Sequence, residues 1–154
     1  MKTVTLLFLR RNDEVLLAMK KRGFGTGKWN GVGGKVEEHE HVRAAIIREC
    51  QEEITVTPHK PVLMGRLHFY DLRDPDFYHD CHIFVADKWE GEPAETEEMR
   101  PRWFHRDGIP YNNMWADDII WLPHLLNDKT FEGSVTLDGD DIHHHDITIK
   151  PARN

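Results

Sequence analysis

The sequence predicts a mixed α/β (α+β) fold in which one β-sheet lies between helices, and three observations support this class. Apolar, β-branched runs joined by turn residues occur at both ends of the chain. A clear helical period without glycine or proline ends near residue 54, and a second helical stretch follows residue 114. Strands interrupted by two helices, with a hairpin at each end, favour a mixed sheet that helices cover on both faces.

The first third of the chain predicts a hairpin, a loop and a helix. Residues 4–9 and 15–19 are β-prone runs separated by an Asn-Asp turn, so we expect them to pair. Residues 20–36 contain six glycines and no periodic pattern, which is typical of a structured loop with a function. Helical spacing then runs from about residue 40 to 54, and Pro58 closes the β-branched stretch after it.

The rest of the chain predicts further strands around one more helix. Residues 62–72 and 79–89 read as strands around a turn-rich segment, and residues 101–105 read as a short strand. Residues 115–127 predict a helix that starts at Asp117 and Asp118, in which Pro123 must produce a kink or a shift of path. Residues 131–137 and 142–149 predict a closing hairpin. From its length we expect residues 1–154 to form a single domain.

Composition narrows the class of partner. With 20 Lys and Arg against 27 Asp and Glu, the formal net charge of −7 disfavours a nucleic-acid polymer or an anionic membrane. A polyanionic ligand therefore requires a local basic patch or a metal ion. No apolar run is long enough to span a bilayer, no signal peptide is recognisable, and Cys50 and Cys81 form no disulfide framework. We therefore expect a cytoplasmic protein that binds a small molecule.

Three glutamates in the first predicted helix are the clearest candidates for chemistry. Glu49, Glu52 and Glu53 stand at i, i+3 and i+4, so they share a helix face that is in line with part of the apolar stripe. Shielded carboxylates this close repel one another and must take up protons or bind cations. Oxygen ligands alone favour Mg²⁺ or Mn²⁺. The alternative is a solvated acidic surface in which the three glutamates pair with Arg48 and Arg43.

The same helix and the loop before it resemble the Nudix box, the signature of hydrolases that cleave nucleoside diphosphates linked to another group. The polar residues that carry the resemblance are Gly34-x5-Glu40-x7-Arg48-Glu49-x2-Glu52-Glu53. Thr55 departs from the pattern where the box has a late glycine, and His39 stands where glycine is common. Because such a glycine eases a left-handed turn, the Thr55 departure concerns the end of the helix more than a metal site.

The resemblance implies a Nudix-like α/β/α sandwich and a metal-dependent attack of water on phosphorus. Arg48 would orient a catalytic glutamate, and Glu40 would hold Arg48. The general base remains open among Glu52, Glu53 and Glu98. The implied ligands of Mg²⁺, or of Mn²⁺ in its place, are Gly33 through its carbonyl, Glu49, Glu52, Glu53 and Glu98. The implied catalytic set is Arg48, Glu49, Glu52, Glu53 and Glu98.

The resemblance extends from about residue 3 to residue 149, and in residues 20–36, 97–104 and 114–123 it is to the Nudix hydrolases of oxidised purine nucleotides. It implies a monomer that hydrolyses 8-oxo-dGTP and 2-oxo-dATP to the monophosphate and pyrophosphate and so sanitises the nucleotide pool. The implied substrate-binding residues are Thr5, Lys20, Phe24, Asn30, Gly33, Gly34, Lys35, Phe69, Met99, Trp115, Asp117, Asp118 and Trp121.

Several alternatives stay open. The adjacent Asp117 and Asp118 could share a proton and so recognise different purines, or could simply satisfy a helix N-terminus. Val32 and Ala116 replace a Phe and a Pro that are usual in these relatives, which leaves a methylated or capped nucleotide as another substrate. A non-catalytic nucleotide-binding module is a further alternative. The tract at residues 143–145 favours a surface or sheet-edge role over a transition-metal site.

Overall fold

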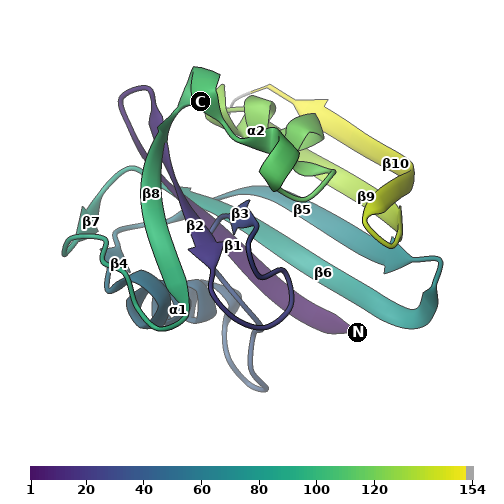
Figure 1. Cartoon of the computed structure of the whole chain (residues 1–154), viewed down its shortest axis with the longest axis horizontal. Helices are drawn as coiled ribbons and strands as arrows, with labels where there is room; N and C mark the ends of the chain where they lie inside the picture. The colour runs from purple at the N-terminus through teal and green to yellow at the C-terminus, as the bar shows by residue number, and fades with distance from the viewer. Residues whose placement is uncertain (152–154) are drawn as a thin grey trace.

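One mixed sheet of eight strands organises the computed structural model, which describes residues 1–151 (Figure 1). Its main path runs β10-β9-β5-β6-β1-β2-β3, and β8 pairs with β2. The pairs β1–β6 and β5–β9 are parallel and the others antiparallel. The strands of this sheet are β1 (Lys2–Arg11), β2 (Glu14–Lys20), β3 (Trp29–Asn30), β5 (Val62–Asp71), β6 (Asp74–Ala86), β8 (Met99–His105), β9 (Thr130–Asp138) and β10 (Asp141–Lys150), while β4 (Thr57–Pro58) and β7 (Trp89–Glu90) form a separate pair.

Two helices, α1 (Val42–Ile54) and α2 (Asp118–Leu126), lie on opposite sides of the sheet (Figure 1). Leu7 and Leu9 of β1 belong to the buried cluster under α1, whereas Phe8 between them packs in the cluster under α2. This alternation is what a strand with two covered faces requires. The predicted α/β (α+β) class, with a mixed sheet between helices, is confirmed. Between β8 and α2 the chain makes two short 3₁₀ turns, Arg106–Gly108 and Tyr111–Asn113.

Within residues 1–151, no helix combines the length and the apolar character that crossing a membrane requires.

The first hairpin opens after its turn and admits the glycine-rich segment. Strands β1 and β2 pair directly only next to the turn, at Arg10 and Arg11. Further along β1, residues 32–36 take over as its neighbour, with the Thr5 amide donating to the Gly34 carbonyl at 2.9 Å. A Cβ on Gly33 would lie 1.9 Å from the Thr5 carbonyl oxygen, so only glycine fits there. This close approach fixes the glycine loop between the first strand and α1.

Several predicted boundaries were wrong. The strand predicted at 79–89 is β6, which begins at Asp74 and ends at Ala86. It begins earlier than predicted because the polar residues after the β5–β6 turn pair with β5. The first helix starts at Val42 instead of residue 40, since the Glu40 side chain accepts the Glu37 amide in a turn. The second helix spans 118–126 instead of 115–127, and Pro123 lies within it without ending it.

Both positions at which the chain departs from the glycines of the Nudix box have left-handed backbones. Thr55 has φ 63° and ψ 29° after the last residue of α1, and its amide bonds back to the final turn. His39 has φ 66° in the loop before the helix. The turns that glycine would ease are therefore retained, with non-glycine residues in a conformation that costs about 1–2 kcal/mol per residue.

We predict that His39→Gly stabilises the protein. The substitution relieves left-handed strain at an exposed side chain, and the greater freedom of glycine in the unfolded chain offsets part of the gain. The free energy of unfolding, measured by urea denaturation, should rise by up to about 1 kcal/mol. His41→Gly is the matched control, because His41 has an ordinary φ of −69° and should gain nothing. Equal changes in the two variants would contradict the strain argument.

Candidate active site

Glu53 is the most deeply shielded glutamate of α1. It is 4% exposed, and its Oε2 accepts a hydrogen bond from the Gly33 amide at 3.0 Å. Burial, with smaller contributions from the charges of Glu49 and Glu98, raises the pKa of Glu53 to about 8. The Gly33 amide and the more distant charge of Lys20 act in the opposite direction. A buried carboxylate among other carboxylates is the electrostatic setting that a bound cation relieves.

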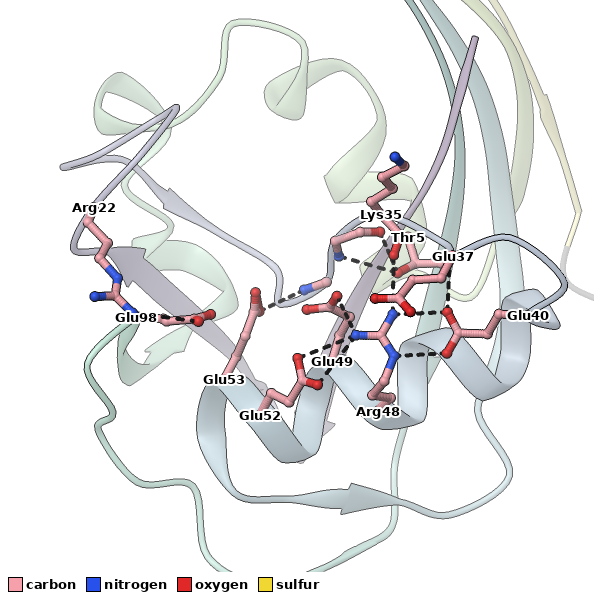
Figure 2. Close-up of polar contacts among 12 residues, drawn as sticks. Thr5, Arg22, Lys35, Glu37, Glu40, Arg48, Glu49, Glu52, Glu53 and Glu98 are labelled. Carbon is pink, nitrogen blue, oxygen red and sulfur yellow. Dashed lines mark hydrogen bonds and ion pairs between the residues drawn. The ribbon is translucent and has the colours of Figure 1, made fainter.

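Arg48 connects the carboxylates along α1 (Figure 2). Its Nε and one terminal nitrogen bind the two oxygens of Glu40 at 2.8 and 2.9 Å, and its other terminal nitrogen lies 3.0 Å from Glu49 Oε1. The hydrogen bonds from Arg48 lower the pKa of Glu40 to about 2. Burial raises the pKa of Glu49, against the effect of Arg48. Arg48 is thus fixed by Glu40 and holds Glu49 in turn.

Glu52 corrects the prediction of three glutamates on one shielded face. The Glu52 side chain is 54% exposed because it projects to the solvent side of the helix, where it lies 3.3 Å from Arg48, whereas Glu53 turns toward the sheet (Figure 2). Glu98, which comes from the loop before β8, is half-exposed and lies 3.8 Å from Arg22. Of the four glutamates predicted to bind the metal, Glu49 and Glu53 are therefore the shielded ones.

The carboxylates are near one another without forming a closed ligand set. In the described part of the chain, no three His, Cys, Asp or Glu side chains are grouped closely enough to hold a metal ion. Each carboxylate instead faces a nitrogen of the protein, such as the Gly33 amide or the Arg48 guanidinium. Even so, Glu49 and Glu98 both raise the pKa of Glu53 through their charge. Shielded oxygen donors whose charges act on one another suit a divalent cation.

A cavity of about 230 Å³ adjoins this cluster. Gly33 and Gly34 connect the two, since both line the cavity, Gly33 binds Glu53, and a Cβ on Gly34 would lie 2.7 Å from Glu49 Oε1. Of the predicted substrate-binding residues, those that line the cavity are Thr5, Lys20, Phe24, Asn30, Gly33, Gly34, Phe69, Met99, Trp115, Asp117, Asp118 and Trp121. Lys35 is not among the lining residues, and its carbonyl instead accepts a hydrogen bond from Arg48 at 3.2 Å.

Two buried aspartates line the cavity. Asp117 and Asp118 are 4% and 2% exposed. Asp117 accepts a hydrogen bond from the Trp121 indole at 2.8 Å and makes no side-chain cap, whereas Asp118 accepts one from the Trp115 amide at 3.1 Å. Burial raises the pKa of both groups, that of Asp118 the more strongly because the charge of Asp117 adds to the effect.

An aromatic pair lines the cavity, with Phe24 from the glycine loop and Trp115 from the segment before α2. Phe24 is 71% exposed and stacks on Trp115, with ring centroids 5.1 Å apart. The Lys28 ammonium lies 5.2 Å from the centre of the Trp115 ring. A Cβ on Gly25 would approach that ring to 3.0 Å, so glycine allows the loop to pass close over the tryptophan. The loop thus contributes both an aromatic surface and a positive charge.

Sequence reasoning missed a group of wall residues on β6. Phe77, His79 and Cys81 line the cavity, and the rings of Phe77 and His79 stack with centroids 4.2 Å apart. Their spacing of two residues was the available signal, because such residues share one face of a strand. Cys81 is buried, and burial raises the pKa of its thiol. Further lining residues that were not predicted are Val4, Leu6, Ala18, Gly25, Gly31 and Leu137.

The chain is similar to nucleotide hydrolases in sequence and in structure. A family model described as NUDIX domain matches residues 1–125. The oxidized purine nucleoside triphosphate hydrolase of Danio rerio is 47% identical over 141 residues, covering 92% of this chain and 90% of that protein. The protein of the same name from Mus musculus is 43% identical over 137 residues, covering 89% and 87%. A crystal structure of a MutT protein from Bacillus halodurans matches with a TM-score of 0.83 at 25% identity, covering 99% of this chain and 100% of that one.

Proposed function

Because the chain belongs to the Nudix family, we propose that it hydrolyses oxidised purine nucleoside triphosphates, including 8-oxo-dGTP and 2-oxo-dATP, to the monophosphate and pyrophosphate. One observation carries the proposal: the cavity that contains the buried Asp117 and Asp118 meets the carboxylate cluster at Gly33. A purine and its phosphates could therefore occupy adjoining parts of one site. The relatives from zebrafish and mouse support this substrate class through their names.

Catalysis requires a divalent cation, for which we propose Mg²⁺ with Mn²⁺ as a substitute. Its proposed ligands are Gly33 through its carbonyl, Glu49, Glu52, Glu53 and Glu98. When bound, it supplies Lewis acidity and compensates the charge of the polyphosphate. Arg48 holds Glu49, and Lys20 and Lys28 bring positive charge to the cavity wall. The general base is one of Glu52, Glu53 and Glu98.

Recognition of the base is assigned to the buried end of the cavity. Asn30 Oδ1 already accepts the Gly31 amide at 2.8 Å, which leaves the Asn30 amide group as a donor to the base. Asp117 and Asp118 add acceptor and donor capacity that depends on where the proton lies. Phe24, Phe69 and Trp115 supply apolar surface for the faces of the ring.

Hydrolysis of 8-oxo-dGTP beside unmodified dGTP tests the proposal. With Mg²⁺, ion-exchange chromatography should resolve 8-oxo-dGMP and pyrophosphate, formed faster than dGMP from dGTP. Removal of the metal with a chelator should stop both reactions, and added Mg²⁺ should restore them. The substrate assignment fails if folded, metal-loaded protein hydrolyses dGTP at the same rate as 8-oxo-dGTP. It also fails if both nucleotides remain intact.

The two residues that favoured a methylated or capped nucleotide as the substrate do not lie at the cavity. Val32 is buried in the cluster under α1, Ala116 is exposed, and neither lines the cavity. We extend the proposal to a monomeric, cytoplasmic enzyme that acts on free nucleotides, with residues 1–154 as one catalytic domain. The net charge of −7 supports free nucleotides over a nucleic-acid polymer.

A further inference from the structure

The hydroxyl of Thr96 lies between α1, which carries Glu53, and the loop before β8, which carries Glu98. It donates a hydrogen bond to the Glu53 carbonyl at 2.7 Å. The same oxygen accepts hydrogen bonds from the Glu98 and Met99 amides, each at 3.3 Å. One partly buried oxygen therefore contacts the backbones of two proposed metal ligands and of one residue of the cavity wall.

The peptide group of Glu98 is held from the other side as well. Its carbonyl accepts the Lys21 amide at 2.9 Å, and the Lys21 ammonium donates to the Thr96 carbonyl at 2.7 Å. Next to this contact, Lys20 pairs with Met99 in the β2–β8 ladder. The backbone around Glu98 is thus fixed between the start of the glycine loop and the hydroxyl of Thr96.

A hydroxyl is the side-chain group that suits this position. The Glu53 carbonyl lies in the last turn of α1, where carbonyls have no partner within the helix. The Glu98 and Met99 amides need an acceptor, and the Glu53 carbonyl needs a donor. A hydroxyl provides both functions, whereas the isosteric isopropyl group of valine provides neither. Unsatisfied backbone groups would then draw the loop toward solvent and away from Glu53.

We propose that Thr96 is a positioning residue that sets the separation between Glu53 and Glu98 and thereby assembles the metal site. The inference rests on the proposed function, because it takes these two glutamates as ligands of the catalytic cation. Thr96 acts through the backbones of both residues and touches neither the metal nor the nucleotide. Loss of its hydroxyl should weaken metal binding and turnover while the fold is retained.

Three variants test this role: Thr96→Val, Thr96→Ser and the control Thr55→Val. Thr55 also donates its hydroxyl to a backbone carbonyl, that of Glu92 at 3.2 Å, and within residues 1–151 it makes no hydrogen bond to Glu98. Mn²⁺ binding, followed by electron paramagnetic resonance of the free ion, and kcat at saturating 8-oxo-dGTP should each fall about 10–100-fold in Thr96→Val. In Thr96→Ser and Thr55→Val, both the affinity for Mn²⁺ and kcat should stay within about threefold of the parent, well below the effect of about 10–100-fold expected for Thr96→Val.

The outcomes separate positioning from general stability and from the proposed function. All measurements are made well below the unfolding temperature of each variant, determined by circular dichroism. The proposal is overturned if Thr96→Val binds Mn²⁺ and turns over like the parent, or if Thr96→Ser loses as much as Thr96→Val. If the parent hydrolyses none of the nucleotides, the proposed function fails. The positioning role of Thr96 is then judged from Mn²⁺ binding: weaker binding by Thr96→Val, but not by the other two variants, would support it. Unchanged Mn²⁺ binding by Thr96→Val would overturn the positioning role.

Discussion

Glu53→Gln should reduce turnover of 8-oxo-dGTP by at least about 10²–10³-fold, the range seen when one electrostatic partner of a transition state is removed. Glutamine has the same shape and keeps a carbonyl oxygen for the Gly33 amide, so the local hydrogen bond survives. What is lost is the negative charge of the most shielded proposed ligand. The measurement is kcat at saturating Mg²⁺ and nucleotide, with the exposed Glu52 as the site of the comparison variant Glu52→Gln.

The same substitution should stabilise the metal-free protein at alkaline pH. The pKa of Glu53 is about 8 in the folded chain and near the ordinary 4.5 in the unfolded chain. Between these values the unfolded state releases its proton while the folded state keeps it, so the parent loses stability as pH rises, by about 1.4 kcal/mol per pH unit. The loss is complete above pH 8. Glutamine has no such dependence.

Urea denaturation in the presence of a chelator, at pH 5 and pH 9, measures this difference. Relative to the parent, the free energy of unfolding of Glu53→Gln should rise by several kcal/mol from pH 5 to pH 9, by the same linkage. Glu52→Gln should gain little, because the Glu52 side chain is 54% exposed. Parallel stability curves for the parent and Glu53→Gln would show that Glu53 is not held in a shielded, protonated state. A stability gain paired with an activity loss is what a site built for a cation implies.

Local patterns made α1 predictable, and the limits of the pattern are also visible there. Ile46, Cys50 and Ile54 form the buried stripe of the helix, as the helical period requires. At 100° per residue, Glu53 projects about 20° from Ile46 at the edge of the buried stripe, whereas Glu52 lies about 100° further from the stripe. The spacing i, i+3, i+4 placed the glutamates on one broad face but did not distinguish its shielded edge from its solvent edge. Tertiary packing made that distinction.

Contacts distant in sequence were not predictable in the same way. The opening of the β1–β2 hairpin depends on residues 32–36 lying along β1, and this is decided by the tight fit of Gly33 against Thr5. The polar start of β6 has the composition of a turn, so Phe77 was assigned outside the strand although pairing with β5 extends the strand past it. Thr96 stands in an acidic run that has the composition of a solvated loop, and its three hydrogen bonds emerge only from the fold.

Asp118→Asn should change the preference between 8-oxo-dGTP and 2-oxo-dATP. Burial and the charge of Asp117 raise the pKa of Asp118 above that of Asp117, so of the two acids Asp118 is the better suited to hold a proton. Asp117, which accepts from the Trp121 indole, is better suited to carry the charge. An oxidised guanine and an oxidised adenine present different donors and acceptors, and a proton that moves between the two acids can match each.

Asparagine fixes one pattern, because its oxygen can keep the bond from the Trp115 amide while its amide group donates permanently. The nucleotide that needs an acceptor at Asp118 then leaves a buried group unsatisfied, at about 1–3 kcal/mol, or roughly 10–100-fold in kcat/KM. The other nucleotide should change only severalfold. Measuring kcat/KM for both nucleotides from pH 5 to pH 9 in the parent, Asp117→Asn and Asp118→Asn checks this. If the two pH profiles coincide in both variants and the ratio of kcat/KM equals that of the parent, the two aspartates do not select the base through a shared proton.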